Sequence, residues 1–324
     1  MDKTIKWAIC GLGKISRRFY KAASSLPNTR IVACVSSSKE RALKYQKRYG
    51  IESAYTYDEL IANAKSIDAV YICNLTNQHA VTAKRFLEAG IPTLCEKPLS
   101  LTAKDAEAMI SASRKNNVLL MEAMWTRFLP ATLYLRELIK SGEMGPIMGI
   151  RARFEAGIGH GPNSRVFKKA TGGGSIMDLG VYPVSYAEMF LGIPQSISVA
   201  GQLNKEKIDL CCKGELAYPK GVSMKFRTSL KFLQIHETCY IDCENGTIKI
   251  PRFYQAKKLL IKHSDGRTEK KVFEKIDGFS YEILHFNDLI RRGMKESPIM
   301  THKSSFEVVK ILETMNQQLG VYFD

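Results

Sequence analysis

The sequence contains no run of about 18 consecutive apolar residues, so we expect no membrane-spanning helix. Its first residues, MDKTIKWAICGLG, enter a strand pattern too soon to leave room for a signal peptide. Internal repeats and low-complexity segments are also missing. These absences predict a cytoplasmic globular protein. At 324 residues, with 45% hydrophobic and 25% charged residues, the chain is long enough for two domains.

The eight cysteines give little support to a metal site. His236, Cys239 and Cys243 are the one combination that suggests such a site, but two cysteines four positions apart on a strand would lie roughly 13 Å apart. The adjacent Cys211 and Cys212 would point to opposite faces of a strand. The other four cysteines end apolar runs, where a small buried residue suits a sheet: Cys10, Cys34, Cys73 and Cys95. We therefore expect reduced, mostly buried thiols and no metal.

A long basic stripe with interleaved aromatics is missing too, although the formal net charge is +16. The basic residues are scattered as short pairs such as Lys168-Lys169 and Arg291-Arg292, and no nucleic-acid-binding module is recognisable. We expect a solvated basic surface that attracts anionic ligands, and no nucleic-acid partner. The alternative, nucleic-acid binding, would show a steep dependence on salt concentration.

The apolar pattern divides the chain into two halves. In the first half, short apolar runs alternate with amphipathic helical stretches, which indicates βαβ units and a doubly wound parallel sheet. The expected strands cover residues 5–10, 31–35, 69–74, 91–96 and 117–122. The expected helices include residues 41–50 and 80–90, and each of these two stretches closes on a glycine.

After Pro130 the pattern changes to one helix and then a series of longer strands. Turn pairs such as Asn245-Gly246 separate several of these strands and indicate antiparallel hairpins. The expected helices cover residues 132–145, 280–292 and 302–319, and the expected strands cover 147–157, 195–204, 208–218, 222–232, 235–243, 247–253 and 259–264. The predicted fold is α/β followed by α+β: a Rossmann domain over residues 1–122 and, over 123–324, a substrate-binding and oligomerisation domain built on an open, mostly antiparallel sheet.

The stretch CGLGKIS, residues 10–16, follows the first strand and opens a helix. Gly11 would form the tight turn, and Gly13 would let the backbone approach a pyrophosphate at the helix N-terminus. Ser16 stands in place of the third glycine of GxGxxG and is small enough for close packing. The first half is therefore predicted to bind a dinucleotide.

The end of the second strand indicates which nicotinamide cofactor binds. An NAD site would place an acid there for the ribose 2′-hydroxyl, but the chain continues Val35-Ser36-Ser37-Ser38-Lys39-Glu40-Arg41. Hydroxyl groups, a helix N-terminus, Lys39 and Arg41 could all receive a 2′-phosphate, so NADP is preferred over NAD. Ser37 and Glu40 also fit a capping box, which is compatible with this reading.

Glu96-Lys97-Pro98 ends an apolar strand at the carboxyl edge of the parallel sheet, where ligands bind. With CGLGKIS, EAMWTRFLP (122–130) and GGGSIMDLGVYPV (172–184), it makes the chain resemble the Gfo/Idh/MocA oxidoreductases nearly end to end. EAMWTRFLP and the GxYP ending resemble the dimeric dihydrodiol dehydrogenase and NADP-dependent sugar dehydrogenase branch. The family usually has Thr-Pro-Asn where this chain has Asn74-Leu75-Thr76, so backbone contacts to the cofactor are expected there.

The resemblance implies a set of site residues. Those expected to bind cofactor are Gly11, Gly13, Lys14, Ile15, Ser36, Ser37, Arg41, Asn74, Leu75, His79, Glu96, Lys97 and Arg127. Those expected to contact substrate are Trp125, Phe154, Tyr254 and Phe279. Trp125 and Arg127 also follow directly after the last expected Rossmann strand. Each aromatic residue in the set is equally compatible with a place in the core.

Alcohol oxidation needs a hydride acceptor and a base, and the stretch GGGSIMDLGVYPV carries the candidate. A free tyrosine, with a pKa of about 10, is a poor base at neutral pH, but a nearby ammonium lowers that pKa. Tyr182 is therefore expected to act as the catalytic acid/base if Lys97 lies beside it. Asp178, four residues earlier on the same helical face, would orient substrate or share the proton relay. The alternative is a packed helix in which Asp178 is a surface acid and Tyr182 fills the core.

These features predict an NAD(P)-dependent dehydrogenase or reductase of a small sugar, polyol or cyclic diol. The alternative is a sensor that binds NADP without turnover. An open sheet with one uncovered face favours a homodimer or homotetramer, as is usual in the resembled family.

Overall fold

The computed structural model describes residues 3–157, 161, 163–231, 236–274 and 276–323. It confirms the predicted fold class, a Rossmann sheet followed by a mostly antiparallel sheet. The chain divides into two compact units, residues 1–125 with 277–305 and residues 126–276 with 306–324. The boundary expected at 122/123 lies three residues before the first division, and residues 277–305, expected in the second domain, group with the first unit.

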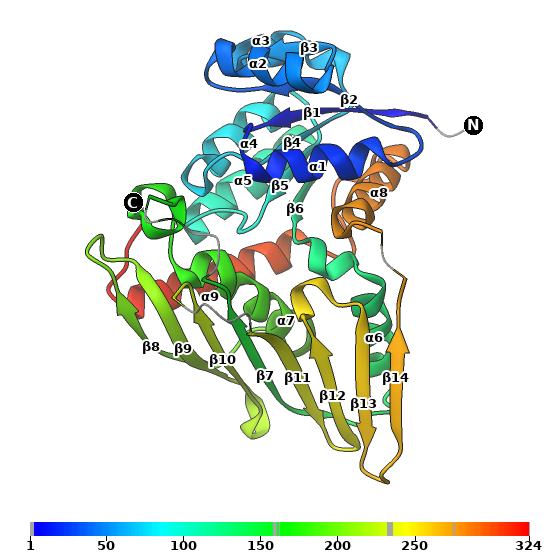
Figure 1. Ribbon diagram of the computed structural model, residues 1–324, viewed down its shortest axis with the longest axis vertical. Helices are drawn as coiled ribbons and strands as arrows, with labels where there is room; N and C mark the ends of the chain where they lie inside the picture. Colours follow the sequence, from blue (N-terminus) through cyan, green and yellow to red (C-terminus); the bar gives the residue numbers. More distant parts are fainter. Residues whose placement is uncertain (1–2, 158–160, 162, 232–235, 275, 324) are drawn as a thin grey trace. The chain divides into compact units, whose positions relative to one another are not determined.

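The first unit contains a six-stranded parallel sheet in the order β3-β2-β1-β4-β5-β6 (Figure 1). Its strands are β1 (Ile5–Cys10), β2 (Thr29–Val35), β3 (Ser53–Tyr55), β4 (Ala69–Ile72), β5 (Thr93–Glu96) and β6 (Leu120–Ala123). The order reverses beside β1, so the crevice at the carboxyl ends of β1 and β4 is the ligand position of this fold. The five expected strands are present, and β3 is an additional edge strand.

Successive strands of the first unit are connected by α1 (Lys14–Ser24), α2 (Lys39–Tyr49), α3 (Tyr57–Ala62), α4 (His79–Glu88) and α5 (Ala103–Asn116). The unit also contains α8 (Gly278–Arg291), which follows the strands of the second unit in sequence. The expected terminal glycines follow α2 and α4: Gly50 and Gly90 adopt φ values of +64° and +78°. Such left-handed conformations are accessible to glycine at no steric cost.

Helix α8 belongs to the first unit although it follows the second unit's sheet in sequence, and hydrogen bonds of Asn287 explain this. The indole Nε1 of Trp7 donates to the Oδ1 of Asn287 over 2.9 Å, and Asn287 Nδ2 donates to the hydroxyl of Thr29 over 2.9 Å. Phe286 packs on Trp7 with ring centroids 5.1 Å apart. Because Trp7 is fully buried and its N–H needs an acceptor, a residue from near the end of the chain completes the core of the first strand.

The second unit contains an eight-stranded sheet in the order β14-β13-β12-β11-β7-β10-β9-β8. Its strands are β7 (Ile147–Glu155), β8 (Ser196–Leu203), β9 (Asp209–Ala217), β10 (Ser223–Ser229), β11 (His236–Cys243), β12 (Gly246–Pro251), β13 (Lys258–His263) and β14 (Thr268–Val272). Every neighbouring pair is antiparallel except β7 and β10, which are parallel. The edge strand β14 was not expected, and Phe232 and Ile235, at the ends of two expected strands, lie outside the described residues.

The helices of this unit are α6 (Pro130–Lys140), α7 (Val181–Leu191) and α9 (His302–Gln318), the last of which begins in the first unit. Alternate residues of the strands are buried, for example Cys239, Ile241 and Cys243 on β11. His236 therefore points to the opposite face from Cys239 and Cys243, which separates the three residues considered for a metal site. All eight cysteines are free thiols.

No helix in the described part of the chain is both long enough and apolar enough to cross a membrane.

Candidate functional site

The turn between β1 and α1 has the properties of a pyrophosphate-binding loop. Gly11 has φ +98°, and a Cβ there would lie 2.4 Å from the backbone N of Asn74, so only glycine fits. A Cβ on Gly13 would meet no atom within 4 Å, so this residue borders open space. No side chain caps α1, and its first turn has no acidic residue. Its N-terminal N–H groups, which include those of Lys14 and Ile15, are therefore available to an anion.

Ser16, which replaces the third glycine of the motif, is fully buried. Its hydroxyl donates to the carbonyl of Gly13 over 2.7 Å and accepts from the hydroxyl of Tyr45 over 3.2 Å. The serine therefore ties the first turn of α1 to α2.

At the end of β2, the capping box expected between Ser37 and Glu40 is not formed. The N-cap of α2 is Ser38, whose hydroxyl accepts from the backbone N of Arg41, because α2 begins one residue later than the box requires. The hydroxyl of Ser37 instead accepts from the guanidinium of Arg41 over 3.0 Å. Within the described ranges, no carboxylate forms an ion pair with Arg41.

The neighbouring cation is already paired. Lys39 donates to the carbonyl of Ala54 and forms an ion pair with Glu59 over 2.7 Å. The ammonium of Lys39 holds the pKa of Glu59 below its usual value. Of the two cations at this strand end, Arg41 is the one that can meet a phosphate without breaking an ion pair. Ser36, next to the strand end, is buried, and its hydroxyl accepts from the backbone N of Ser38.

The segment after β4 packs against the glycine turn. Asn74 donates from Nδ2 to the hydroxyl of Thr82 over 2.9 Å, while its buried Oδ1 has no hydrogen-bond partner among the described atoms. Leu75 precedes a 3₁₀ turn over Thr76–Gln78. His79 begins α4, and its Nδ1 lies 3.1 Å from the carbonyl oxygen of Pro98. The histidine thus joins α4 to the loop that contains Lys97.

Glu96 is a buried support for that loop. It accepts a hydrogen bond from the hydroxyl of Tyr71, and one of its oxygens lies 3.2 Å from the backbone N of Lys97. Burial raises the pKa of Glu282 on α8 well above its usual value, and the nearby Glu96 raises it further. Sequence reasoning missed Glu282, because no local pattern brings α8 to this strand.

We expected residues 172–184 to enter one regular helix. The structure does not have a single α-helix there. Ile176–Gly180 forms a π-helix, and α7 begins at Val181. Asp178 therefore lies in a wide π turn and Tyr182 in the first turn of α7, so the simple i to i+4 relation of an α-helix does not describe their relative direction. Short π segments of this kind are frequent at functional sites.

The glycines before this segment are required by contacts inside the second unit. A Cβ on Gly173 would lie 2.6 Å from the carbonyl oxygen of Val166. Gly174 has φ +113°, and a Cβ there would lie 2.3 Å from Oδ1 of Asp209. Gly173 and Gly174 are therefore needed for packing inside their own unit.

Asp209, which sequence reasoning also missed, anchors the start of the π-helix. Its carboxylate accepts from the hydroxyl of Ser175 over 2.5 Å and from the backbone N of Ile176 over 2.9 Å. The hydroxyls of Ser175 and Thr228 lie 2.9 Å apart. Burial raises the pKa of Asp209 to about 6 despite these hydrogen bonds.

Asp178 is held by an ion pair. Its carboxylate accepts from the guanidinium of Arg165 over 2.8 Å, and its side chain is 14% exposed. It is therefore a partly buried, oriented acid and not the solvated surface acid of the alternative reading.

Three of the expected site aromatics form one cluster in the second unit. The ring centroids of Phe154 and Tyr182 are 5.2 Å apart, those of Tyr182 and Tyr254 are 5.7 Å apart, and those of Phe154 and Tyr254 are 4.7 Å apart. Burial raises the pKa of Tyr254 to about 12. Tyr182 is thus fixed by two rings that were expected to contact substrate.

The other two aromatics form a separate cluster in the first unit. Trp125 and Phe279 stack with centroids 5.5 Å apart. The guanidinium carbon of Arg18 lies 4.7 Å and 4.6 Å from their ring centroids, and Arg18 also pairs with Asp277. Sequence reasoning missed Arg18, whose position on α1 gives no signal of an aromatic partner.

Arg127, expected to bind cofactor, has buried partners on α7. Its guanidinium donates to the hydroxyl and carbonyl of Ser185 over 2.9 Å each and forms an ion pair with Glu188. These bonds give it a role in anchoring the helix that carries Tyr182.

Sequence reasoning also missed a group of possible metal ligands. Glu143, His263 and Glu269 place ligand atoms within 4.8 Å of one another. Glu269 is, however, already bonded to His263 over 2.9 Å and paired with Lys271 over 2.7 Å.

The comparisons with known proteins identify the family. An NAD-binding Rossmann oxidoreductase model matches residues 5–124, and the GFO/IDH/MocA C-terminal domain model matches residues 132–249. Trans-1,2-dihydrobenzene-1,2-diol dehydrogenase from Mus musculus is 30% identical, over 98% of each chain. The enzyme of that name from Xenopus tropicalis is 32% identical, over 98% of this chain and 99% of the relative.

This chain belongs to the Gfo/Idh/MocA oxidoreductase family. It is therefore an oxidoreductase with an NAD-binding Rossmann domain.

Solved structures of similar proteins share its fold over nearly the full length. An aldose–aldose oxidoreductase from Caulobacter crescentus, complexed with glycerol, is 23% identical with a TM-score of 0.87 over 98% of each chain. A 3-ketoreductase from Actinomadura kijaniata, complexed with NADP and TDP-benzene, is 23% identical with a TM-score of 0.85 over 98% of each chain.

The residues of the first unit fit the dinucleotide of the Gfo/Idh/MocA family. The uncapped N-terminus of α1 suits a pyrophosphate, and the open space at Gly13 gives it room. The orphaned Oδ1 of Asn74 supplies a hydrogen-bond acceptor beside the turn. No acid occupies the position after β2 where an NAD ribose would be bound.

We predict that Asp209 makes stability depend on pH. Because its folded-state pKa is about 6 and its ordinary value is 3.8, the folded protein retains a proton that the unfolded chain has lost. The stabilisation from that proton is complete below pH 3.8 and is lost as pH rises through 6, a change of about 3 kcal/mol. Thermal unfolding between pH 4 and 7.5 should show the wild type losing stability relative to Asp209→Asn. A difference between the two proteins that stays constant over this range would contradict the prediction.

Proposed function

We propose that this enzyme transfers a hydride between NADP and a secondary alcohol or carbonyl of a small sugar, polyol or cyclic diol. The observation that carries the proposal is the buried phenol of Tyr182, which packs against the rings of Phe154 and Tyr254 and lies on a helix matched by the family model. The names of the relatives, a dihydrodiol dehydrogenase and an aldose–aldose oxidoreductase, support the substrate class. When bound, the nicotinamide supplies or accepts the hydride.

Tyr182 would take the hydroxyl proton during oxidation and return it during reduction. The ammonium of Lys97 would favour the phenolate and so bring its pKa toward the working pH. Glu96 would hold the loop of Lys97 through its contact with the backbone N of that residue. Asp178, oriented by Arg165, would bind a substrate hydroxyl or pass on the proton.

The first unit would supply most of the cofactor site and also Trp125 and Phe279 for the substrate, and the second unit would supply the other substrate contacts and Arg127. Gly11, Gly13, Lys14 and Ile15 would bind the pyrophosphate from the turn and the first turn of α1. The remaining proposed cofactor contacts are Ser36, Ser37, Arg41, Asn74, Leu75, His79, Glu96, Lys97 and Arg127. The proposed substrate contacts are Trp125, Phe154, Tyr254 and Phe279.

NADP would be preferred because Arg41 is a guanidinium without an ion-pair partner in the described chain. Its bond to Ser37 directs it toward the end of β2. A 2′-phosphate there would accept from Arg41 and from the hydroxyl of Ser37.

A cytoplasmic location stays a prediction that the eight free thiols support.

Tyr182→Phe should lower kcat by about 10²- to 10⁴-fold, because removal of a general acid/base costs this much.

Lys97→Met should move the pH profile of kcat for alcohol oxidation to higher pH, since the phenolate loses its cation. The kcat of each variant, including its pH profile, is measured from the absorbance of the reduced cofactor at 340 nm, with trans-dihydrobenzenediol and a panel of sugars as substrates. Tyr186→Phe on the same helix is the control, because its hydroxyl lies 3.1 Å from that of Thr132 inside the core.

If Tyr182→Phe kept the full kcat of the wild type, Tyr182 would not be the general acid/base. If the protein bound NADP tightly but turned over no substrate of the panel, the alternative of a sensor without turnover would be favoured.

Arg41→Ala should raise KM for NADP about 10- to 100-fold and leave KM for NAD nearly unchanged, because only NADP has the 2′-phosphate. Steady-state kinetics with each cofactor measure the ratio. Arg48→Ala, an exposed arginine near the other end of α2, is the matched control. Equal losses with NAD and NADP would show that Arg41 does not read the phosphate.

We further propose a homodimer or homotetramer that packs through the polar face of the eight-stranded sheet. On β8–β10 this face has small residues, such as Ala200 and Ala217, beside charges that are already paired within it, such as Lys225 with Glu215. Paired charges and small side chains allow close approach of a second copy. Sedimentation velocity at micromolar concentration should show a dimer or tetramer, and a monomer would contradict the proposal.

A further inference from the structure

The inner face of β11 carries an acid at a position where apolar residues are usual. Glu237 is 5% exposed and lies on the same face of the strand as the buried Cys239. In the strand register it is opposite Phe154 of β7, one of the rings that pack against Tyr182. The second unit therefore places a carboxylate beside the aromatic cluster of Phe154, Tyr182 and Tyr254.

Hydrogen bonds connect this carboxylate to the phenol of Tyr254. The hydroxyl of Tyr254 donates to Glu237, and the Nε of Arg252 donates to Oε2 of Glu237 over 3.1 Å. The phenolic oxygen of Tyr254 accepts from the amide Nε2 of Gln255 over 2.8 Å. Burial, reinforced by the charge of Glu237, raises the pKa of Tyr254 to about 12, so the phenol keeps its proton at neutral pH. The phenol is thus a donor toward Glu237 and an acceptor toward other groups.

The turn that presents Tyr254 is held in place by its backbone. It is a 3₁₀ turn over Phe253–Gln255, and the hydroxyl of Thr126 donates to the carbonyl of Tyr254 over 2.8 Å. Arg252, directly before the turn, has a left-handed backbone with φ +51°. This conformation is uncommon for a residue with a long side chain, so the chain bears a local cost to keep the turn.

Folding alone does not account for the acid at this position. Burying a carboxylate is costly, and replacing a buried ion pair by apolar residues is often neutral or stabilising. Arg252 does not require Glu237 as a partner, because its side chain is 65% exposed and water can solvate it. The specific contribution of Glu237 is the direction that it gives to the proton of Tyr254.

Building on the proposed function, we propose that Glu237 is a positioning residue that makes Tyr254 the acceptor for a second hydroxyl of the substrate. Because Tyr254 donates its own proton to Glu237, it would accept from a hydroxyl adjacent to the one that Tyr182 deprotonates. The substrate hydroxyl would replace the amide of Gln255 as the donor to this oxygen. The ring centroids of Tyr182 and Tyr254 lie 5.7 Å apart, a separation that one small diol can span.

The arrangement selects a chemical class of substrate. A vicinal diol, whether a cyclic diol or a sugar, supplies both the reacting hydroxyl and the donor to Tyr254. A mono-alcohol lacks that donor and would leave Tyr254 without the substrate's hydrogen bond. A site built to bind a hydroxyl in this way discriminates against the analogue that lacks it.

Binding is measured without turnover, with the full-length protein saturated with NADPH so that an alcohol cannot be oxidised. The probes are trans-1,2-cyclohexanediol and cyclohexanol, which share a ring and differ by one hydroxyl. Their dissociation constants are obtained from ligand-observed NMR titrations. Wild type should bind the diol about tenfold more tightly than cyclohexanol, which is the factor that one additional hydrogen bond supplies.

Two variants test the two residues separately. Tyr254→Phe keeps the ring and removes the acceptor, so the two dissociation constants should come within about threefold of each other. Glu237→Gln should reduce the preference for the diol in the same direction, because an amide can donate to the phenol as well as accept from it. A merely structural role of either residue would weaken the binding of both ligands alike.

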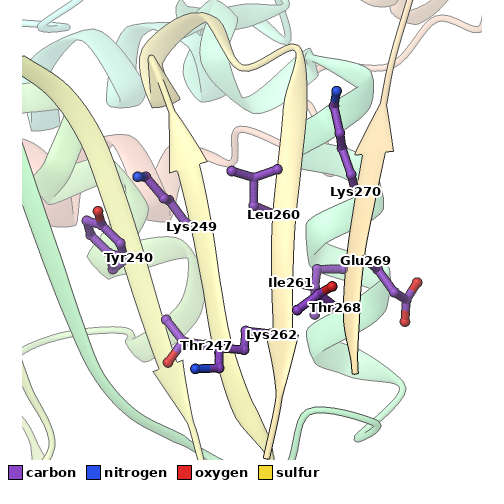
Figure 2. A pocket seen from close by; sticks show the side chains of 9 residues that line it. All are labelled: Tyr240, Thr247, Lys249, Leu260, Ile261, Lys262, Thr268, Glu269 and Lys270. Carbon is purple, nitrogen blue, oxygen red and sulfur yellow. The ribbon is translucent and has the colours of Figure 1, made fainter. Parts of the chain in front are cut away.

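The matched control is Tyr240→Phe, which removes a phenolic hydroxyl from the same strand. Tyr240 lies on the opposite face of β11 from Glu237 and lines a groove over β11–β14 (Figure 2). This control should keep the wild-type preference for the diol.

The proposal would be overturned by any of four results. They are no measurable binding of the diol, equal affinity of the wild type for the two ligands, a preference for the diol that persists in Tyr254→Phe or Glu237→Gln, and an equal loss of affinity for both ligands in these variants. Saturation with NADPH is established first, and no readout involves hydride transfer. Failure here is therefore distinguishable from failure of the proposed function, which the kinetics of Tyr182→Phe test.

Discussion

A buried carboxylate, that of Asp209, sets the geometry of the candidate site. It accepts hydrogen bonds from Ser175 and Ile176 at the start of the π-helix, and its closeness to the backbone excludes any side chain at residue 174. The segment it holds leads directly to Tyr182. The position of the proposed catalytic phenol therefore depends on a hydrogen-bond-accepting carboxyl group whose charged form is destabilised by burial.

Two further contacts keep α7 in place. The ion pair of Arg127 with Glu188 fixes the second turn of the helix, and the rings of Phe154 and Tyr254 fix Tyr182 from the side. A catalytic group held by its neighbours loses little entropy when substrate binds, which is the physical basis of preorganisation. The same logic applies to Lys97, whose loop is tied to Glu96 and, through Pro98, to His79.

Sequence reasoning was most successful where a pattern repeats over many residues. Alternating strands and helices predicted the parallel sheet, and the glycines after α2 and α4 marked the helix ends. It missed β3 and β14, because both are short edge strands in which half the pairing and much of the burial are absent. The predicted N-cap of α2, Ser37, was wrong by one residue, because the N-cap is Ser38. Ser36, Ser37 and Ser38 are equally suitable by residue type, so only the backbone conformation decides which of them is the cap.

The candidate site shows the same difference between features that a local pattern predicts and features that depend on distant contacts. Motif residues such as Gly11 could be read directly, because the turn they form is local. Asp209, Arg18 and Glu282 could not, because each acts on residues more than thirty positions away and has no local pattern. The π-helix was missed because its sequence fits a regular helix equally well.

The hydrogen bonds of Asn287 to Trp7 and Thr29 have a consequence for how the polypeptide matures on the ribosome. The earliest strands to be synthesised cannot satisfy the indole N–H of Trp7 until α8, some 280 residues later, has emerged. The intervening eight-stranded sheet is complete in sequence before that moment. The first unit to begin folding is thus the last to be closed, and nascent chains must carry an unfinished nucleotide fold through most of translation.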